Sequence, residues 1–130
     1  MAMTIGEFDE PHLAARQMAE TRPVDLVHLA RYTLGDRDME REVLSLFADR
    51  CDQDVARLRS AQSATEWQRA CHTIKGSARA IGAWKLARLA EEGETMQPAD
   101  CDAQASEAVA RIDAAASEVK AFIKHLKSTG

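Results

Sequence analysis

The segment that decides the fold is ASEAVARIDAAASEVKAFIKHL, residues 105–126. Its larger apolar residues and two of its alanines recur at alternating spacings of four and three, in the order Ala105, Val109, Ile112, Ala116, Val119, Ile123 and Leu126. This heptad-like spacing places the whole set on one side of an α-helix. Because the seam covers only about three heptads, it favours the core of a helical bundle over a coiled-coil dimer.

The composition of the chain agrees with a single helical domain. The 130 residues suffice for one domain with a real core, and they include only 6 glycines and 3 prolines. Abundant alanine and charged residues favour helices over sheets. The net charge of -4 arises from interspersed acidic and basic residues. A nucleic-acid partner more often leaves a basic stripe, so we expect none.

Cysteine usage and hydropathy predict a cytoplasmic protein. The three cysteines, Cys51, Cys71 and Cys101, are far apart and odd in number, so reduced thiols are the simplest account. No run approaches the roughly 18 apolar residues of a membrane span, and no membrane association is expected. Met1–Glu10 is acidic and lacks the basic-then-apolar layout of a signal peptide.

The first 22 residues are weakly patterned and are predicted to form an N-terminal extension. Within them, Asp9 as a cap and Pro11 in the first turn are compatible with a short helix that ends at Met18. Pro23 then opens a second short helical segment, Val24–Tyr32. One of its faces carries Leu26, Leu29 and Ala30.

Three further helices are predicted between residues 34 and 94. Leu34-Gly35-Asp36 reads as a stop followed by a new N-cap, from which a long helix runs to about Ala61. Its apolar stripe consists of Met39, Val43, Leu44, Phe47, Cys51, Val55 and Leu58. Ser63 or Thr65 begins the next helix, which Gly82 ends or interrupts. The third runs over Ala83–Glu94 with Leu86, Leu89 and Ala90 turned inward, and Gly93–Asp102, which includes Pro98, is predicted to be a loop.

Four amphipathic helices with short connections cannot bury their apolar stripes singly. We therefore predict an all-α fold, an antiparallel four-helix bundle over residues 23–127, in which helices cross at the usual ~20°. One or two short N-terminal helices would cover an end of it. A monomer is expected because the bundle uses up the apolar stripes.

The most informative histidine lies in ACHTIKGSARAIG, residues 70–82. At ~100° per residue, one side of this helix carries an apolar set: Trp67, Cys71, Ile74, Ala78 and Ile81. Nearly opposite lies a polar set: Gln68, His72, Lys75, Gly76 and Arg79. His72 is thereby directed to solvent beside a fixed positive charge, whereas Cys71 is directed inward as core filler.

The chemistry of this polar side suits a nucleophile that acts on an anion. An unperturbed imidazole titrates near ~6.5 and is largely neutral and nucleophilic at neutral pH. Lys75 becomes an attractive partner once a phosphoryl group is on the ring, and Arg79 widens the positive surface. Gly76 costs about 1 kcal/mol relative to alanine in a helix interior, and its missing side chain lets another protein approach. An exposed helical histidine alone is usually only a surface residue, so the combination carries the argument.

This segment resembles the histidine-containing phosphotransfer (HPt) domain family. His72-Thr73-Ile74-Lys75-Gly76-Ser77, followed by Gly82, is similar to the family pattern H-x-x-K-G-S-x-x-x-x-G. The downstream Leu86–Glu91 and the upstream Leu46-Phe47 also look like the family. The resemblance covers roughly residues 23–126 and leaves the first 22 residues unexplained.

The resemblance implies a phosphorelay intermediate, a phosphocarrier without autonomous kinase activity. His72 would be the phosphoacceptor, through Nε2, Lys75 would steady the phosphoryl oxygens and Gly76 would make room for docking. The implied partners are response-regulator receiver domains and a hybrid histidine kinase. The resemblance implies no cofactor or metal on this chain, because Mg²⁺ is expected on the partner receiver. From geometry alone, Gln68 and Arg79 join the receiver-docking residues.

Two other classes of function stay open at the level of the sequence. One is a phosphorylation-independent helical adaptor that binds a receiver or kinase. The other is a structural bundle with an incidental histidine. The solvent-facing Gly76 argues against this second class, since a plain scaffold gains nothing from a glycine that weakens its helix.

Overall fold

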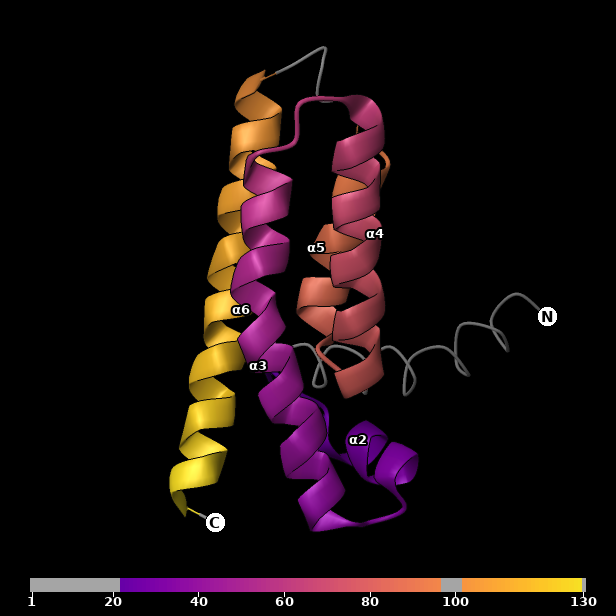
Figure 1. The fold of residues 1–130 in the computed structure, drawn as a ribbon, viewed down its shortest axis with the longest axis vertical. Coiled ribbons are helices and arrows are strands. Elements are labelled where there is room, and N and C mark those ends of the chain that lie inside the picture. Colours follow the sequence, from indigo (N-terminus) through magenta and orange to yellow (C-terminus); the bar gives the residue numbers. More distant parts are fainter. Residues whose placement is uncertain (1–21, 97–101, 130) are drawn as a thin grey trace, which may run out of the picture.

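The described part of the protein, residues 22–96 and 102–129 of a computed structural model, contains helices and no strand. Figure 1 shows them in chain order: α2 (Leu26–Thr33), α3 (Arg37–Arg59), α4 (Ala64–Ile81), α5 (Trp84–Glu94) and α6 (Asp102–Thr129). The helix predicted to end at Met18 lies outside the described residues. Within the described ranges, none of the helices combines the length and the apolar character needed to cross a bilayer.

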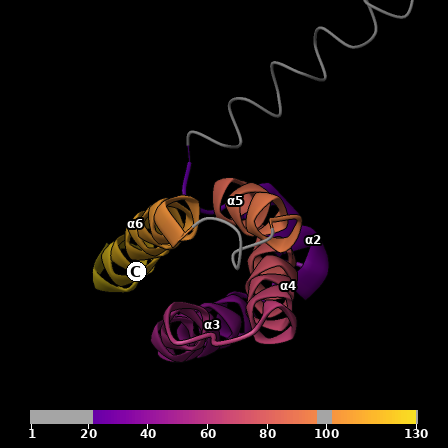
Figure 2. The ribbon, with the colours of Figure 1, turned by 90° about the horizontal axis from the view of Figure 1, so that it is seen from above.

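The four longer helices form the predicted antiparallel bundle. Each contacts two others, α3 with α4 and α6, and α5 with α4 and α6, which gives the ring seen from above in Figure 2. The short α2 packs on α3 and α4. Successive helices run in opposite directions along the long axis (Figure 1), as short connections require.

The seam of α6 belongs to the core of this bundle. Ile112, Ala116, Val119 and Ile123 are at most 2% exposed. Ala105, Val109 and Leu126 at the two ends of the seam are half-buried against the core. Buried side chains of α3, α4 and α5 complete the core, among them Leu44, Leu58, Ile74 and Leu86.

The apolar faces predicted for α2 and α3 each include a residue that the structure leaves exposed. Met39, in the first turn of α3, is 44% exposed, and Leu26, at the start of α2, is 41% exposed. Leu29 is the buried leucine of α2. Apolar periodicity identifies the direction of a side chain but not the point along a helix at which its packing partners end.

The turn between α2 and α3 is as predicted. Leu34 ends α2 in the left-handed region with φ 56°, and Gly35 follows with φ 80°. Asp36 then caps α3, because its carboxylate accepts hydrogen bonds from the N–H groups of Asp38 and Met39.

Asp25 joins the start of α2 to the end of α4. Its N–H donates to the Gly82 carbonyl at 2.9 Å, and its carboxylate caps α2 and accepts the Trp84 indole N–H at 2.9 Å. Burial raises the pKa of Asp25, but these hydrogen bonds outweigh it and leave the pKa below its ordinary value. Gly82 has φ 78°, and a Cβ there would lie 2.9 Å from Asp25 Cβ. Gly82 therefore ends α4.

Candidate functional site

Helix α4 presents the candidate site on its exposed side. Ser63 caps the helix by accepting the Glu66 N–H at 3.1 Å, so Ser63 rather than Thr65 marks its start. The predicted apolar set is buried, each member at most 4% exposed: Trp67, Cys71, Ile74, Ala78 and Ile81. The predicted polar set lies on the other side, where Lys75 alone is half-buried.

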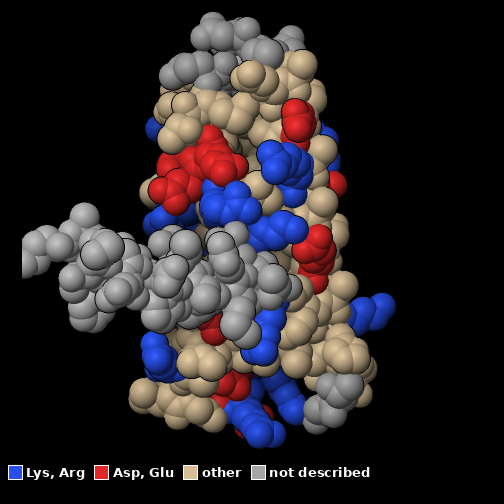
Figure 3. Space-filling model, turned by 180° about the vertical axis from the view of Figure 1, so that it is seen from behind, with Lys and Arg blue, Asp and Glu red and all other residues tan. Residues whose placement is uncertain are grey.

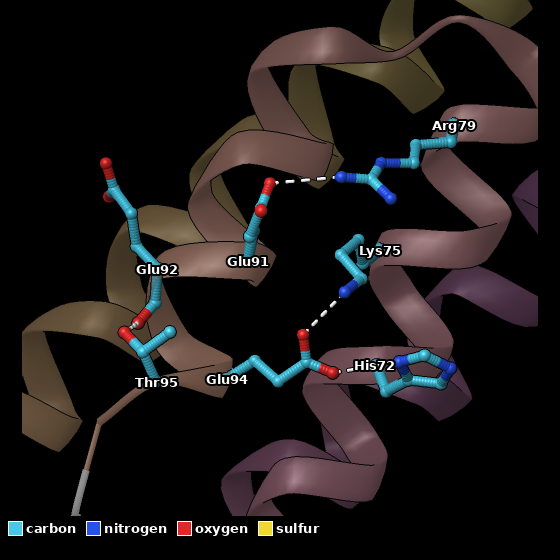
Figure 4. Close-up of polar contacts among 7 residues, drawn as sticks. All are labelled: His72, Lys75, Arg79, Glu91, Glu92, Glu94 and Thr95. Carbon is cyan, nitrogen blue, oxygen red and sulfur yellow. Dashed lines mark hydrogen bonds and ion pairs between the residues drawn. The ribbon is translucent and has the colours of Figure 1, made fainter.

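His72 is held at one edge of its ring and open at the other. Its side chain is 71% exposed, and Nδ1 lies 2.8 Å from Oε2 of Glu94 (Figure 4). The bond from Lys75 and then the bond from His72 lower the pKa of Glu94, so this carboxylate is ionised and can only accept. Nδ1 therefore carries the shared proton, and the neutral ring keeps its lone pair on Nε2.

Lys75 is bound to the same carboxylate. Its Nζ lies 2.6 Å from Oε1 of Glu94, and its side chain is only 15% exposed. One carboxylate of α5 thus bridges the imidazole and the ammonium group of α4 (Figure 4). The sequence predicted Lys75 on the polar side of the helix beside His72, and the structure places its ammonium group in an ion pair between two helices.

Glu94 is the functional candidate that the sequence reasoning missed. The predicted helix Ala83–Glu94 agrees with α5, which ends at Glu94, but the overlapping loop prediction from Gly93 onward left Glu94 without a role. Leu86, Leu89, Ala90 and Gly93 form the buried stripe of α5, so a signal did exist. Extension of that stripe by one residue puts an acidic side chain at its edge, toward His72 and Lys75 of α4.

A buried contact fixes the turn that carries Glu94. The Trp67 indole N–H donates to the Gly93 carbonyl at 2.7 Å, and Trp67 is 4% exposed. A Cβ on Gly93 would lie 2.9 Å from Cys71 Sγ. Gly93 is therefore the residue that lets α5 approach α4 closely. Cys71 is core filler, as predicted, and burial raises the pKa of its thiol to about 12.

The predicted docking residues take different positions. Arg79 forms an ion pair with Glu91 at 3.1 Å, again between α4 and α5. Gln68 is exposed on the same side of α4. A Cβ built on Gly76 meets nothing within 4 Å, so packing inside this chain does not require a glycine there. Ser77 lines a groove of about 150 Å³ between α3 and α4.

The surface around the site carries both acidic and basic side chains. Acidic and basic side chains gather next to each other on the rear face (Figure 3), the side on which α5 lies behind α4 in Figure 1. In the described ranges, no group of three or more His, Cys, Asp or Glu is placed to hold a metal ion. The site is therefore one exposed imidazole within a small ion-pair network.

Fold and site together define a helical bundle that displays one oriented histidine at its surface. A family model, the Hpt domain, matches residues 42–128, which include the whole site, and the chain belongs to this family. The family carries out phosphotransfer in two-component signalling, and its members are phosphocarriers. Searches of curated proteins and of solved structures found no significant match.

Proposed function

We propose that the chain is a phosphorelay intermediate that carries a phosphoryl group on Nε2 of His72. It accepts the group from the aspartyl phosphate of one receiver domain and passes it to the aspartate of another. A hybrid histidine kinase is the proposed source of the phosphate, and the chain has no kinase activity of its own. The proposed functional unit is residues 23–127, which act as a cytoplasmic monomer.

The observation that carries this proposal is the bond between His72 and Glu94. With Nδ1 bound, the free lone pair is on Nε2, and 71% of the side chain is open to a docking protein. Attack by Nε2 forms the N–P bond as the P–O bond to the receiver aspartate breaks. The ring then carries a proton on Nδ1 and a positive charge, which the Glu94 carboxylate offsets.

The chain needs little further machinery for such a transfer. Phosphoryl transfer depends on positioning and charge neutralisation, and the stiff bundle supplies the position of the nucleophile. Mg²⁺ on the receiver would supply the neutralising charge. Gln68, Gly76 and Arg79 lie on the side of α4 that carries His72, which supports their assignment to the docking surface.

A transfer assay tests the proposal. The purified chain is mixed with a receiver domain loaded with labelled phosphate, and the modified peptide is mapped by mass spectrometry. We expect an acid-labile, alkali-stable phosphoramidate on His72, among the four histidines of the chain. Stable binding of the receiver without any transfer of label would instead establish the adaptor function.

Gly76→Gln is expected to weaken docking without harm to the fold. Space is open around the new side chain, and loss of a helical glycine stabilises a helix by up to about 1 kcal/mol. We expect receiver affinity, measured by calorimetric titration, to fall about tenfold, or about 1.4 kcal/mol. Thr65→Gln, on an exposed position in the first turn of α4, is the matched control. Equal affinities for the two variants would remove Gly76 from the docking surface.

A further inference from the structure

The ammonium group of Lys75 lies on the Nδ1 side of the imidazole, whereas the phosphoryl group is expected on Nε2. The ammonium group of Lys75 is 2.6 Å from Oε1 of Glu94, whose Oε2 binds Nδ1 of His72. The phosphoryl group is expected on Nε2, across the ring from Nδ1. In this arrangement, Lys75 contacts the carboxylate that holds the ring rather than the position that the phosphoryl group would take (Figure 4).

We infer that Lys75 is a positioning residue that acts on His72 through Glu94, rather than a direct ligand of the phosphoryl group. The inference rests on the proposed function, which it deepens by assigning a different role to the lysine. Lys75 fixes the Glu94 carboxylate, and Glu94 in turn fixes the proton and the orientation of the imidazole.

The burial of the three side chains supports a chain of contacts in which Lys75 fixes Glu94 and Glu94 fixes His72. Lys75 is 15% exposed and Glu94 24% exposed, whereas His72 is 71% exposed. The two covered groups form the shorter bond, and the exposed ring is attached to them. A glutamate side chain has several rotatable bonds, so an unpaired Glu94 would sample many positions and hold the ring in few of them.

The backbone around Glu94 also supports the inference that Lys75 acts through Glu94. Trp67 and Gly93 fix the last turn of α5, which sets where the Glu94 side chain begins, and Lys75 sets where it ends. A second ion pair between α4 and α5, Arg79 with Glu91, lies beside this network and has its own bond at 3.1 Å. Lys75 is therefore the cation that completes the support of Glu94.

A double-mutant cycle tests the inference with Lys75→Met, Glu94→Gln and the combination of both. If Lys75 acts through Glu94, each single change slows transfer from a phosphorylated receiver by about tenfold, and the double variant is no slower than the slower single variant. Multiplication of the two effects to about a hundredfold would overturn the inference, because it would mean that the two side chains act independently.

A second measurement does not depend on transfer. In the unphosphorylated protein, ¹⁵N NMR of the His72 ring reports which nitrogen carries the proton. We expect Lys75→Met to shift the Nδ1 and Nε2 signals in the same direction as Glu94→Gln, and Lys75→Arg to restore them. An unchanged His72 spectrum in Lys75→Met would refute the inference, whatever the outcome of the transfer assay.

Lys85→Met is the matched control for both measurements. Lys85 also lies in an ion pair between helices, with Glu118 of α6 at 3.6 Å, and this pair includes no residue of the site. We expect this variant to keep the wild-type transfer rate and His72 spectrum. Loss of the Nδ1 signal pattern in this control would attribute the Lys75 effect to general loosening of the bundle and would likewise overturn the inference.

Discussion

His72→Gln is expected to abolish phosphate transfer to this chain while the fold is unchanged. The variant keeps a polar side chain of similar length on a position that is 71% exposed. Surface substitutions of this kind usually change stability by no more than about 0.5 kcal/mol. What is lost is the Nε2 lone pair, for which the amide of glutamine offers no nucleophilic substitute at neutral pH.

The measurement is transfer of labelled phosphate from a loaded receiver, with circular dichroism as the check on folding. His125→Gln supplies the matched control, because it removes an exposed histidine from α6. Label that still reaches His72→Gln would mean that another residue accepts the phosphate. Receiver affinity close to that of the wild type, with no label, would show that docking and chemistry are separable.

Trp67→Ala is expected to cost about 3–5 kcal/mol of unfolding free energy, as large aromatic-to-alanine changes in a core do. The indole is 4% exposed, and its N–H also donates a hydrogen bond to the Gly93 carbonyl. Against a total stability of about 5–15 kcal/mol for a typical domain, this is a large fraction. The midpoint of urea unfolding, followed by circular dichroism, measures it.

Trp67→Phe separates the hydrogen bond from the bulk of the ring. The Gly93 carbonyl keeps a second donor, the Met96 N–H at 3.1 Å, so the variant loses one hydrogen bond without leaving the carbonyl unpaired. Because one hydrogen bond contributes about 0.5–1.5 kcal/mol and part of the ring is lost with it, we expect a loss of about 1–2 kcal/mol. Trp84→Phe is the comparison, since its indole N–H binds the Asp25 carboxylate in a partly buried place. A loss for Trp67→Phe within the surface range of about 0.5 kcal/mol would show that the bond to Gly93 does not anchor α5.

Much of the fold followed from helical periodicity and capping chemistry. The seam of α6, the caps at Asp36 and Ser63 and the stop at Gly82 are local features, each determined by residues within a few positions of one another. The direction of His72 was equally local, because it follows from the apolar set on its own helix. Such features are readable from one sequence.

The features that were not predicted depend on contacts between distant segments. Glu94 meets His72 across 22 positions of the chain, and the meeting depends on how closely α5 approaches α4 at Gly93. The burial of Lys75 follows from the same approach. Asp25 caps α2 and binds Trp84, 59 positions away. Periodicity describes the face of one helix and contains no information on the distance to the next.

The site is divided between two helices, and this division widens the set of substitutions that matter for it. A variant at Gly93 or Cys71 changes no exposed residue, yet it changes the separation of α4 and α5 and so the reach of Glu94 to the histidine. In a survey of natural or engineered variants, changes at these core positions belong in the same class as changes at Glu94. We expect the proposed phosphotransfer to slow with changes at these core positions and to stop with changes at His72, although the motif around the histidine is intact in the first case.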